Sequence, residues 1–234
     1  MVAGGVIAII PARGGSKRLP GKNTADFRGR PMIAWTIDAA RQSEKFDRVV
    51  VSTDDAEIAA VARTWGAEAP FLRDVCADDV TPVSEATLRA LEQAETHFGE
   101  SYTTVCQLMP NCPLRTAEDI RVALQEFQRS EAPFQLSCFR FGWMNPWWAV
   151  RLDEGRRPDV LFPEAIGRRS QDLDATYCPT GAIWLAETNA LKEARTFYGP
   201  DHRFLPMDWK HALDIDDRSD LEMAVAAASL IGLK

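Results

Sequence analysis

The chain has 234 residues, enough for one α/β domain with an elaboration or for two small domains, and 46% of them are hydrophobic. Its net charge of −7 argues against a general binding surface for nucleic acid or for a membrane. No apolar run reaches the roughly 18 residues of a transmembrane helix, and no signal peptide is visible. We therefore expect neither nucleic acid nor a membrane as a partner.

The cysteines predict a reducing compartment. There are five of them, widely spaced and without a CxxC pair. Reduced thiols in a cytoplasmic protein are therefore expected, and only Cys112 lies near predicted chemistry.

The first predicted element is a buried strand that leads into a basic, glycine-rich loop. Residues 6–10 are a continuous apolar run rich in β-branched side chains, and Pro11 ends the strand because it has no N–H. Glycines in the loop let backbone amides approach an anion, and four cations surround them, so a phosphate site is predicted at the carboxyl edge of a sheet. A solvated basic turn is the alternative. The residues assigned to the nucleotide here are Ala12, Arg13, Gly14, Gly15, Ser16, Lys17, Lys22 and Asn23.

Helices and strands then alternate as far as residue 141. Apolar residues at helical spacing predict helices from Pro31 to Arg41, from Asp55 through Trp65, from Ser84 to Phe98 and from Thr116 through Phe127. Short apolar runs predict strands over 49–52, 67–72, 103–109 and 134–141, with a further strand from Gly181 and a last helix ending near Gly232. Such alternation is typical of a mainly parallel sheet with helices on both faces, here a single domain over 1–234.

Residues 142–178 interrupt this rhythm. The stretch GWMNPWW places three tryptophans within seven residues, and a polar, turn-rich segment follows. Exposed aromatic clusters of this kind mark protein interfaces, although a hairpin that covers its own sheet is the alternative.

The stretch LDIDD at 213–217 carries the next candidate site. In a strand, alternation would put Asp214 and Asp216 on one face, about 7 Å apart. Two such carboxylates can share Mg²⁺, while Asp217 more naturally caps the last helix. Acids that only decorate a helix start are the alternative.

Six stretches together resemble the acylneuraminate cytidylyltransferases, the synthetases that activate nine-carbon acidic sugars as CMP-sugars. They occur in that family's order and span nearly the whole chain. They are VIAIIPARGGSKRLPGKN (6–23), FDRVVVSTDD (46–55), PNCPLR (110–115), RSQDL (169–173), PTGAIW (179–184) and LDIDD (213–217).

The resemblance implies a Rossmann-like nucleotidyltransferase fold and a Mg²⁺-dependent reaction of CTP with an acidic nonulosonic sugar. Arg13, Lys22 and Asp216 would be catalytic, and Asp214 and Asp216 would bind the metal. It also implies that the 142–178 arm joins two subunits in a homodimer and completes the neighbour's sugar site. Phosphoryl transfer of this kind asks for positioning and for positive charge on the phosphates.

The same resemblance places the base and the sugar. Arg73, Asp79, Thr81 and Ser84 would hold the cytidine. Asn111, Cys112, Arg169, Gln171, Thr180, Gly181 and Trp184 would meet the sugar, with an arginine fork on its carboxylate.

Three departures leave the sugar open. Asn111 and Cys112 stand where sialic acid enzymes usually have Thr-Ser, Met109 where they have Gln, and Trp184 where they have Tyr. RSQDL also resembles the pseudaminic and legionaminic acid branches. The alternatives are a synthetase for the eight-carbon sugar Kdo, and a nucleotide-binding relative without catalysis.

Overall fold

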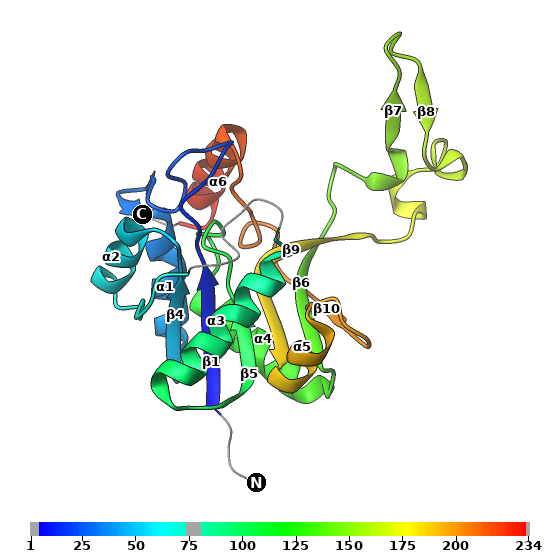
Figure 1. The fold of residues 1–234 in the computed structure, drawn as a ribbon. Helices are drawn as coiled ribbons and strands as arrows, with labels where there is room; N and C mark the ends of the chain where they lie inside the picture. Colours follow the sequence, from blue (N-terminus) through cyan, green and yellow to red (C-terminus); the bar gives the residue numbers. More distant parts are fainter. Residues whose placement is uncertain (1–4, 74–80, 233–234) are drawn as a thin grey trace.

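The computed structural model describes residues 5–73 and 81–232, and a six-stranded sheet forms its centre (Figure 1). The strands lie in the order β10-β6-β9-β5-β1-β4. Their bounds are β1 (Gly5–Pro11), β4 (Arg48–Ser52), β5 (Tyr102–Gln107), β6 (Phe134–Arg140), β9 (Tyr177–Glu187) and β10 (Arg203–Pro206). β1 pairs in parallel with β4 and β5, and β10 in parallel with β6, whereas β9 runs antiparallel to β5 and β6. The predicted mainly parallel sheet is confirmed.

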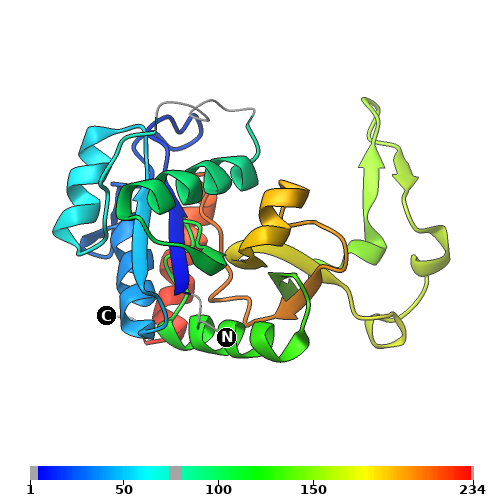
Figure 2. The same ribbon diagram turned by 60° about the horizontal axis from the view of Figure 1, so that its bottom comes forward.

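Helices cover both faces of the sheet, so the predicted three layers are present. One core cluster joins the sheet to α1 (Met32–Ser43), α2 (Ala56–Thr64) and α4 (Ala117–Ser130). The other joins it to α3 (Val83–Phe98) and α5 (Thr188–Ala194). Figure 2 shows these layers from a second side. β1 divides its side chains between the two clusters, because Ala8 and Ile10 face the first and Ile7 and Ile9 the second, all fully buried.

A third cluster closes the end of the sheet where the predicted site lies. α6 (Arg218–Leu230) packs its alanines against Phe27, Met32, Leu114 and Ile215. Phe27 belongs to a small hairpin of β2 (Asp26–Phe27) and β3 (Arg30–Pro31). None of the helices in the described ranges is both long and apolar enough to cross a bilayer.

Local signals in the sequence are confirmed where the contacts are local. Thr116 and Asp119 form a capping box at the start of α4, and Asp217 with Asp220 forms another at the start of α6. Gly66 follows α2 with a φ of +87°, a conformation that favours glycine.

Two predicted strands are absent. The strand expected over 67–72 is reduced to one bridge between Glu68 and Val50, since Pro70 has no N–H with which to continue a ladder. LDIDD is not a strand either: Ile215 N donates to Asn111 O at 2.9 Å, but these five described residues form no ladder with a strand.

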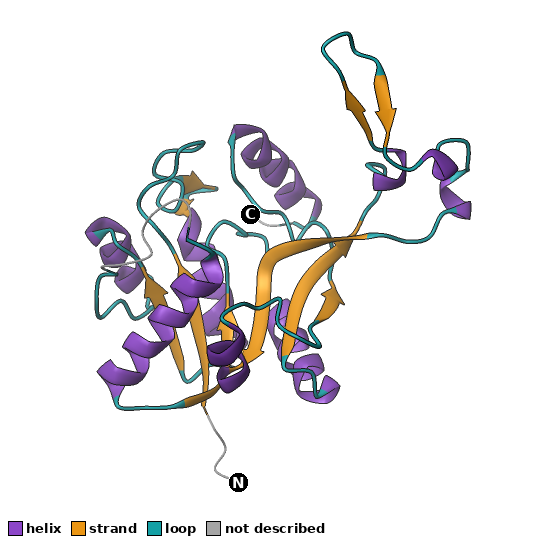
Figure 3. Ribbon diagram, turned by 45° about the vertical axis from the view of Figure 1, so that its right-hand side comes forward, coloured by secondary structure: helices purple, strands orange, loops and turns teal. Residues whose placement is uncertain are grey.

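The segment between β6 and β9 extends away from the body as an arm (Figure 3). It contains η1 (Pro146–Trp148), the hairpin of β7 (Val150–Leu152) and β8 (Pro158–Val160), η2 (Pro163–Ala165) and η3 (Ser170–Asp172). All of residues 142–176 are described, and only Ala165 among them is buried. Trp143 is 87% exposed and Leu152 63%. The arm therefore does not cover its own sheet, which was the alternative reading of its tryptophans.

Candidate active site

The site lies where the carboxyl ends of β4, β1 and β5 meet. β1 is between the other two, and the chain leaves it toward β4 on one side while β5 lies on the other. Such a switch point is where open α/β sheets bind ligands. The loop after β1 begins with Ala12, whose N–H donates to Ser52 O at 2.9 Å, and Leu108 N, just after β5, donates to Ile9 O at 3.0 Å. Three post-strand segments are thus brought together.

The basic loop is fixed from its far end by Asn23. This side chain is 5% exposed, and its Nδ2 donates to Arg13 O at 2.9 Å, while its backbone O accepts from Ile33 N at 3.0 Å. Gly21 adopts a φ of +65° in the turn that precedes it. Asn23, which was assigned to the nucleotide, acts in this structure as the clamp that shapes the loop.

Gly14 brings the loop close to the segment after β4. Its N–H donates to Asp54 Oδ1 at 2.9 Å. A Cβ at this position would lie 2.8 Å from Asp55 Oδ2, so no larger residue fits without a shift. Gly15 has open space around it and Lys17 is exposed, so this half of the loop faces solvent. Asp54 is a site residue that the motif reasoning did not assign, and its signal was its position directly after a buried strand.

Asp216 is the point at which the basic loop and the acidic segment meet. Lys22 Nζ lies 2.8 Å from Asp216 Oδ1, and Arg18 pairs with Asp216 Oδ2. Partial burial would raise the pKa of Asp216, but the hydrogen bonds and charges of Lys22 and Arg18 outweigh it and hold that pKa below its ordinary value. Arg18 was not assigned to the site from the sequence, so the structure adds this contact.

Asp214 has the opposite electrostatics. Desolvation of its carboxyl group, followed by repulsion from Asp216, raises its pKa to about 6, although the residue as a whole is exposed. The Asn111 side chain contacts both carboxylates. A divalent cation bound between the two carboxylates would reduce the repulsion between their negative charges.

The two carboxylates fit Mg²⁺. In the described parts of the chain, no group of three or more His, Cys, Asp or Glu side chains forms a closed metal cage. Mg²⁺ is usually held by one or two carboxylates together with substrate phosphates, which the neighbouring cations would also bind. The donor set therefore matches a metal that is completed by a nucleotide.

The loop after β5 is buried beneath this pair. Cys112 is 0% exposed, and burial, followed by the nearby Asp214 carboxylate, raises the pKa of its thiol. Arg115 is 3% exposed and donates to Met109 O and Ala182 O, tying the loop to β9. Burial lowers the pKa of Arg115 from its ordinary value. Cys112, assigned to the sugar, faces protein in this structure.

The other sugar candidates on β9 lie at different depths. Thr180 Oγ1 donates to Ala212 O at 2.8 Å, which joins β9 to the segment before Asp214. Gly181 leaves room for Met109, whose Cγ would lie 2.6 Å from an added Cβ. Trp184 packs with Phe197 and Tyr198 and donates its indole N–H to Thr180 O at 2.8 Å.

The base candidates are partly described. Arg73 N donates to Thr53 O at 2.7 Å, and its guanidinium is buried, with Nη2 3.9 Å from Asp54 Oδ1. Ser84 is buried at the start of α3 and accepts from Phe197 N at 3.4 Å. Asp79 lies outside the described residues, and Thr81 is partly exposed.

Arg169 and Gln171 lie on the arm, which extends away from the body of the protein (Figure 1). Arg169 is exposed and pairs with Asp172 at 2.7 Å. Gln171 lines a pocket of about 490 Å³ at the root of the arm, together with Arg140, Asn145 and Trp209. The described contacts of one chain do not join these residues to the carboxylate pair.

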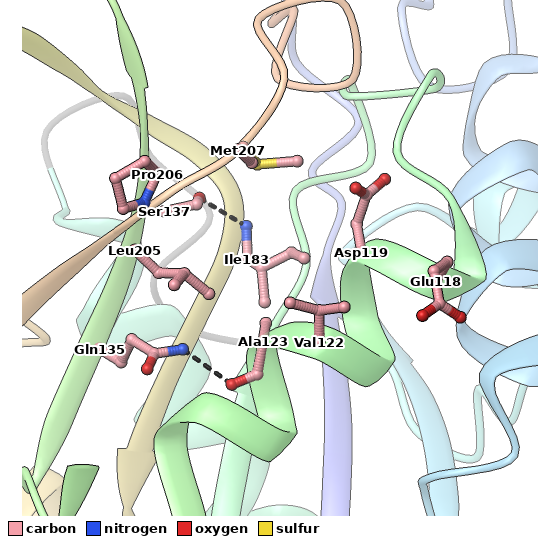
Figure 4. A pocket seen from close by; sticks show the side chains of 10 residues that line it. All are labelled: Glu118, Asp119, Val122, Ala123, Gln135, Ser137, Ile183, Leu205, Pro206 and Met207. Atoms are coloured by element: carbon pink, nitrogen blue, oxygen red, sulfur yellow. Dashed lines mark hydrogen bonds between the residues drawn. The ribbon is translucent and has the colours of Figure 1, made fainter. Parts of the chain in front are cut away.

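A smaller cavity of about 110 Å³ lies between α4 and β10, at the sheet edge opposite β4 (Figure 4). Its lining includes Gln135, Ser137, Leu205 and Met207 but no cationic side chain. It is therefore not a second phosphate site.

This geometry defines a nucleotidyltransferase: a glycine-rich cationic loop opposes a carboxylate pair at the switch point of an α/β sheet. The sequence model of the Cytidylyltransferase family matches residues 7–145, more than half of the chain. The chain belongs to this family, as the six motifs had indicated.

Two relatives and one structure extend the comparison. A pseudaminic acid cytidylyltransferase of Campylobacter jejuni is 34% identical, over 93% of this chain and 94% of that protein. A CMP-N,N'-diacetyllegionaminic acid synthase of Legionella pneumophila is also 34% identical, over 92% of each chain. The structure of a CMP:2-keto-3-deoxy-manno-octonic acid synthetase with CTP superposes with a TM-score of 0.70 at 19% identity, covering 97% of this chain and 99% of that one. At that identity it supports the fold alone.

Proposed function

We propose that the protein transfers the cytidylyl group of CTP to a nine-carbon, 2-keto-3-deoxy acidic sugar. The sugar 2-hydroxyl oxygen forms a bond to the α-phosphorus, the bond to the bridging oxygen breaks in line, and pyrophosphate leaves as the hydroxyl loses its proton to solvent. The observation that carries the proposal is the 2.8 Å contact between Lys22 and Asp216, since it joins the phosphate-binding loop to the acidic pair. The family membership and the 34% identical relatives support it.

The chain's own residues supply position and charge. Arg13 and Lys22 would hold the triphosphate and stabilise the negative charge that develops on pyrophosphate, with amides of the loop assisting them. When the nucleotide binds, Lys22 would exchange an Asp216 oxygen for a phosphate oxygen. Asp214 and Asp216 would hold Mg²⁺, which when bound supplies positive charge to the phosphate oxygens.

The two relatives favour a sugar of the pseudaminic or legionaminic type. A carboxylate beside the reacting hydroxyl suits the guanidinium fork of Arg169, with Arg168 next to it as a substitute. The eight-carbon Kdo remains the alternative sugar, although its synthetase supports only the fold here. A non-catalytic relative is disfavoured because Arg13, Lys22, Asp214 and Asp216 are all retained.

A homodimer is part of the proposal. The arm exposes Trp143, Leu152 and Ile166, and it carries Arg169 away from the body of its own chain (Figure 1). A second subunit would bury the apolar side chains and receive the arginine in its cleft. The cytoplasm, where thiols stay reduced, is the proposed location, with neither nucleic acid nor membrane as a partner.

Pyrophosphate release tests the function. The protein would be incubated with CTP, UTP, ATP or GTP against pseudaminic, legionaminic and N-acetylneuraminic acids and Kdo, with Mg²⁺ and with EDTA. We expect release only with CTP, Mg²⁺ and one of the nine-carbon sugars. Release with Kdo alone would move the assignment to the eight-carbon class, and no release with any pair would contradict it.

A further inference from the structure

Asn111 forms a clamp on both sides of Ile215. Its backbone O accepts from Ile215 N at 2.9 Å, and its side-chain Nδ2 donates to Ile215 O at 3.0 Å. Ile215 itself is fully buried in the cluster with α6. A single residue of the loop after β5 therefore fixes the backbone between the two aspartates.

The same amide nitrogen reaches the carboxylates on either side. Nδ2 lies 3.3 Å from Asp216 Oδ1 and in contact with Asp214 Oδ1. An amide nitrogen has only two hydrogens, so three acceptors share them. The Ile215 carbonyl and the two carboxylates thus share the hydrogens of one nitrogen. Both carboxylates lie close to that nitrogen.

The chemistry of the contact fixes the orientation of the amide. Rotating it by half a turn would place Oδ1 against three acceptor oxygens, which is unfavourable. In the observed orientation, Asn111 is 2% exposed and its Oδ1 is buried without a hydrogen-bond partner. Among the described contacts, the side chain is therefore held through its amide nitrogen.

We propose that Asn111 is a positioning residue, whose amide sets the separation of Asp214 and Asp216 and thereby their affinity for a divalent cation. The inference rests on the proposed function, because it concerns the metal of that reaction. It moves Asn111 from the sugar, where the motif had placed it, to the carboxylates. Without the amide, the two like charges would repel and the pair would lose its preformed spacing. In other metal sites, residues that hydrogen-bond to the metal ligands orient those ligands and so affect the affinity for the metal.

The test compares Asn111→Ala with Gln135→Ala. Gln135 is also a buried amide, 4% exposed, and its Nε2 donates to Ala123 O at 2.8 Å beside the cavity between α4 and β10 (Figure 4). Both variants lose a buried side-chain hydrogen bond, but only one of them faces the carboxylates. Mn²⁺ would be titrated into each protein with a non-hydrolysable CTP analogue, and free Mn²⁺ followed by electron paramagnetic resonance.

We expect Asn111→Ala to weaken Mn²⁺ binding about 10- to 100-fold, and Gln135→Ala to leave it unchanged. In turnover, Asn111→Ala should raise the Mg²⁺ concentration for half-maximal rate, and saturating Mg²⁺ should recover most of kcat. Asn111→Ser keeps a shorter donor and should fall between the wild type and Asn111→Ala. Should Asn111→Ala fail to fold, Asn111→Ser gives the same comparison with the Gln135 control.

Mn²⁺ binding by the Asn111 variants that is no weaker than by Gln135→Ala would overturn the inference while leaving the proposed function intact. A wild-type protein that neither binds Mn²⁺ nor releases pyrophosphate would instead overturn both. The two failures are therefore distinguishable.

Discussion

The loop after β1 and the arm after β6 both present basic side chains, but these side chains are held in different ways. In the loop, Lys22 and Arg18 pair with Asp216 across 194 and 198 residues of sequence. In the arm, Arg169 pairs with Asp172, only three residues away. The tertiary structure of one chain therefore determines the loop, whereas the described contacts of Arg169 do not tie it to the body.

The comparison separates two requirements of one active site. The placement of positive charge near the phosphates depends on contacts within one chain, which involve Asn23, Lys22 and Asp216. Recognition of the sugar carboxylate, on our proposal, depends on contacts that another subunit completes. Substitutions in the two regions should accordingly fail in different ways, and the effects below run from the largest to the smallest.

Asp216→Asn should cost about 10³-fold or more in kcat, because it removes both an anionic metal ligand and the partner of Lys22. Steady-state kinetics at saturating Mg²⁺ would measure it. Asp217→Asn is the matched control, since Asn also caps helices and Asp217 serves as the N-cap of α6. If the Asp216→Asn enzyme kept most of the wild-type kcat, Asp216 would not be a catalytic residue.

Lys22→Ala should lower kcat about 10²-fold, the scale of a lost electrostatic stabiliser. Lys45→Ala is the control, because this exposed lysine precedes β4 and so lies at the other end of the sheet. A higher KM for CTP at unchanged kcat would limit Lys22 to ground-state binding.

Mixing an Arg169→Ala subunit with an Asp216→Asn subunit should restore roughly a quarter of the wild-type activity if the site is shared between subunits. Half of randomly exchanged dimers are mixed, and one of the two clefts in each then carries neither lesion. Tagged subunits would demonstrate exchange. Exchange without recovered activity would show that the arm serves its own chain.

Leu152→Asp should dissociate the proposed dimer, because it places a charge on the apolar surface of the arm. The melting temperature of the rest of the protein should change little. Leu230→Asp is matched to it, since Leu230 is also an exposed leucine, 72% exposed, but lies on α6. Sedimentation would compare the two. Equal effects, or a wild-type monomer, would argue against the arm as an interface.

The smallest effect concerns the end of the sheet opposite the site. Hydrogen bonds from Arg48 and then from Tyr102 lower the pKa of Glu100 from 4.5 to about 2. The stabilisation is therefore complete above pH 4.5 and is lost as the pH falls through about 2. Glu100→Gln should be less stable than wild type at pH 7, and the difference in urea-unfolding free energy should shrink in acid. In an Arg48→Met background the effect of Glu100→Gln should be smaller, and an equal effect would mean that Arg48 is not its cause.

Sequence reasoning predicted the parts of the fold that local chemistry determines. The apolar run at 6–10 indicated a buried strand, and the apolar spacing from Thr116 through Phe127 indicated a helix; both are confirmed. The direction of β9 was not predictable, because nothing in residues 177–187 records that both neighbours run the opposite way. The strand expected over 67–72 is wrong for a related reason, as it finds only one bridging partner.

The candidate site was predictable in its residues but less so in their pairings. The motifs indicated Lys22 and Asp216, which the structure brings together. They did not indicate that Arg18 shares Asp216 or that Asn111 lies between the carboxylates, because these contacts join segments about a hundred or more residues apart. The spacing of residues along the sequence does not show which distant side chains meet in the folded protein.

The root of the arm has a consequence for how such proteins diversify. Phe141 N donates to Thr176 O at 3.0 Å, so the two ends of the arm leave the sheet side by side. An insertion whose ends already meet can lengthen, shorten or be exchanged without moving the strands on either side. The arm can thus be treated as an exchangeable insertion. On our proposal for the arm, grafting one from a relative onto β6 and β9 should change assembly and sugar choice while the residues around Asp216 stay the same.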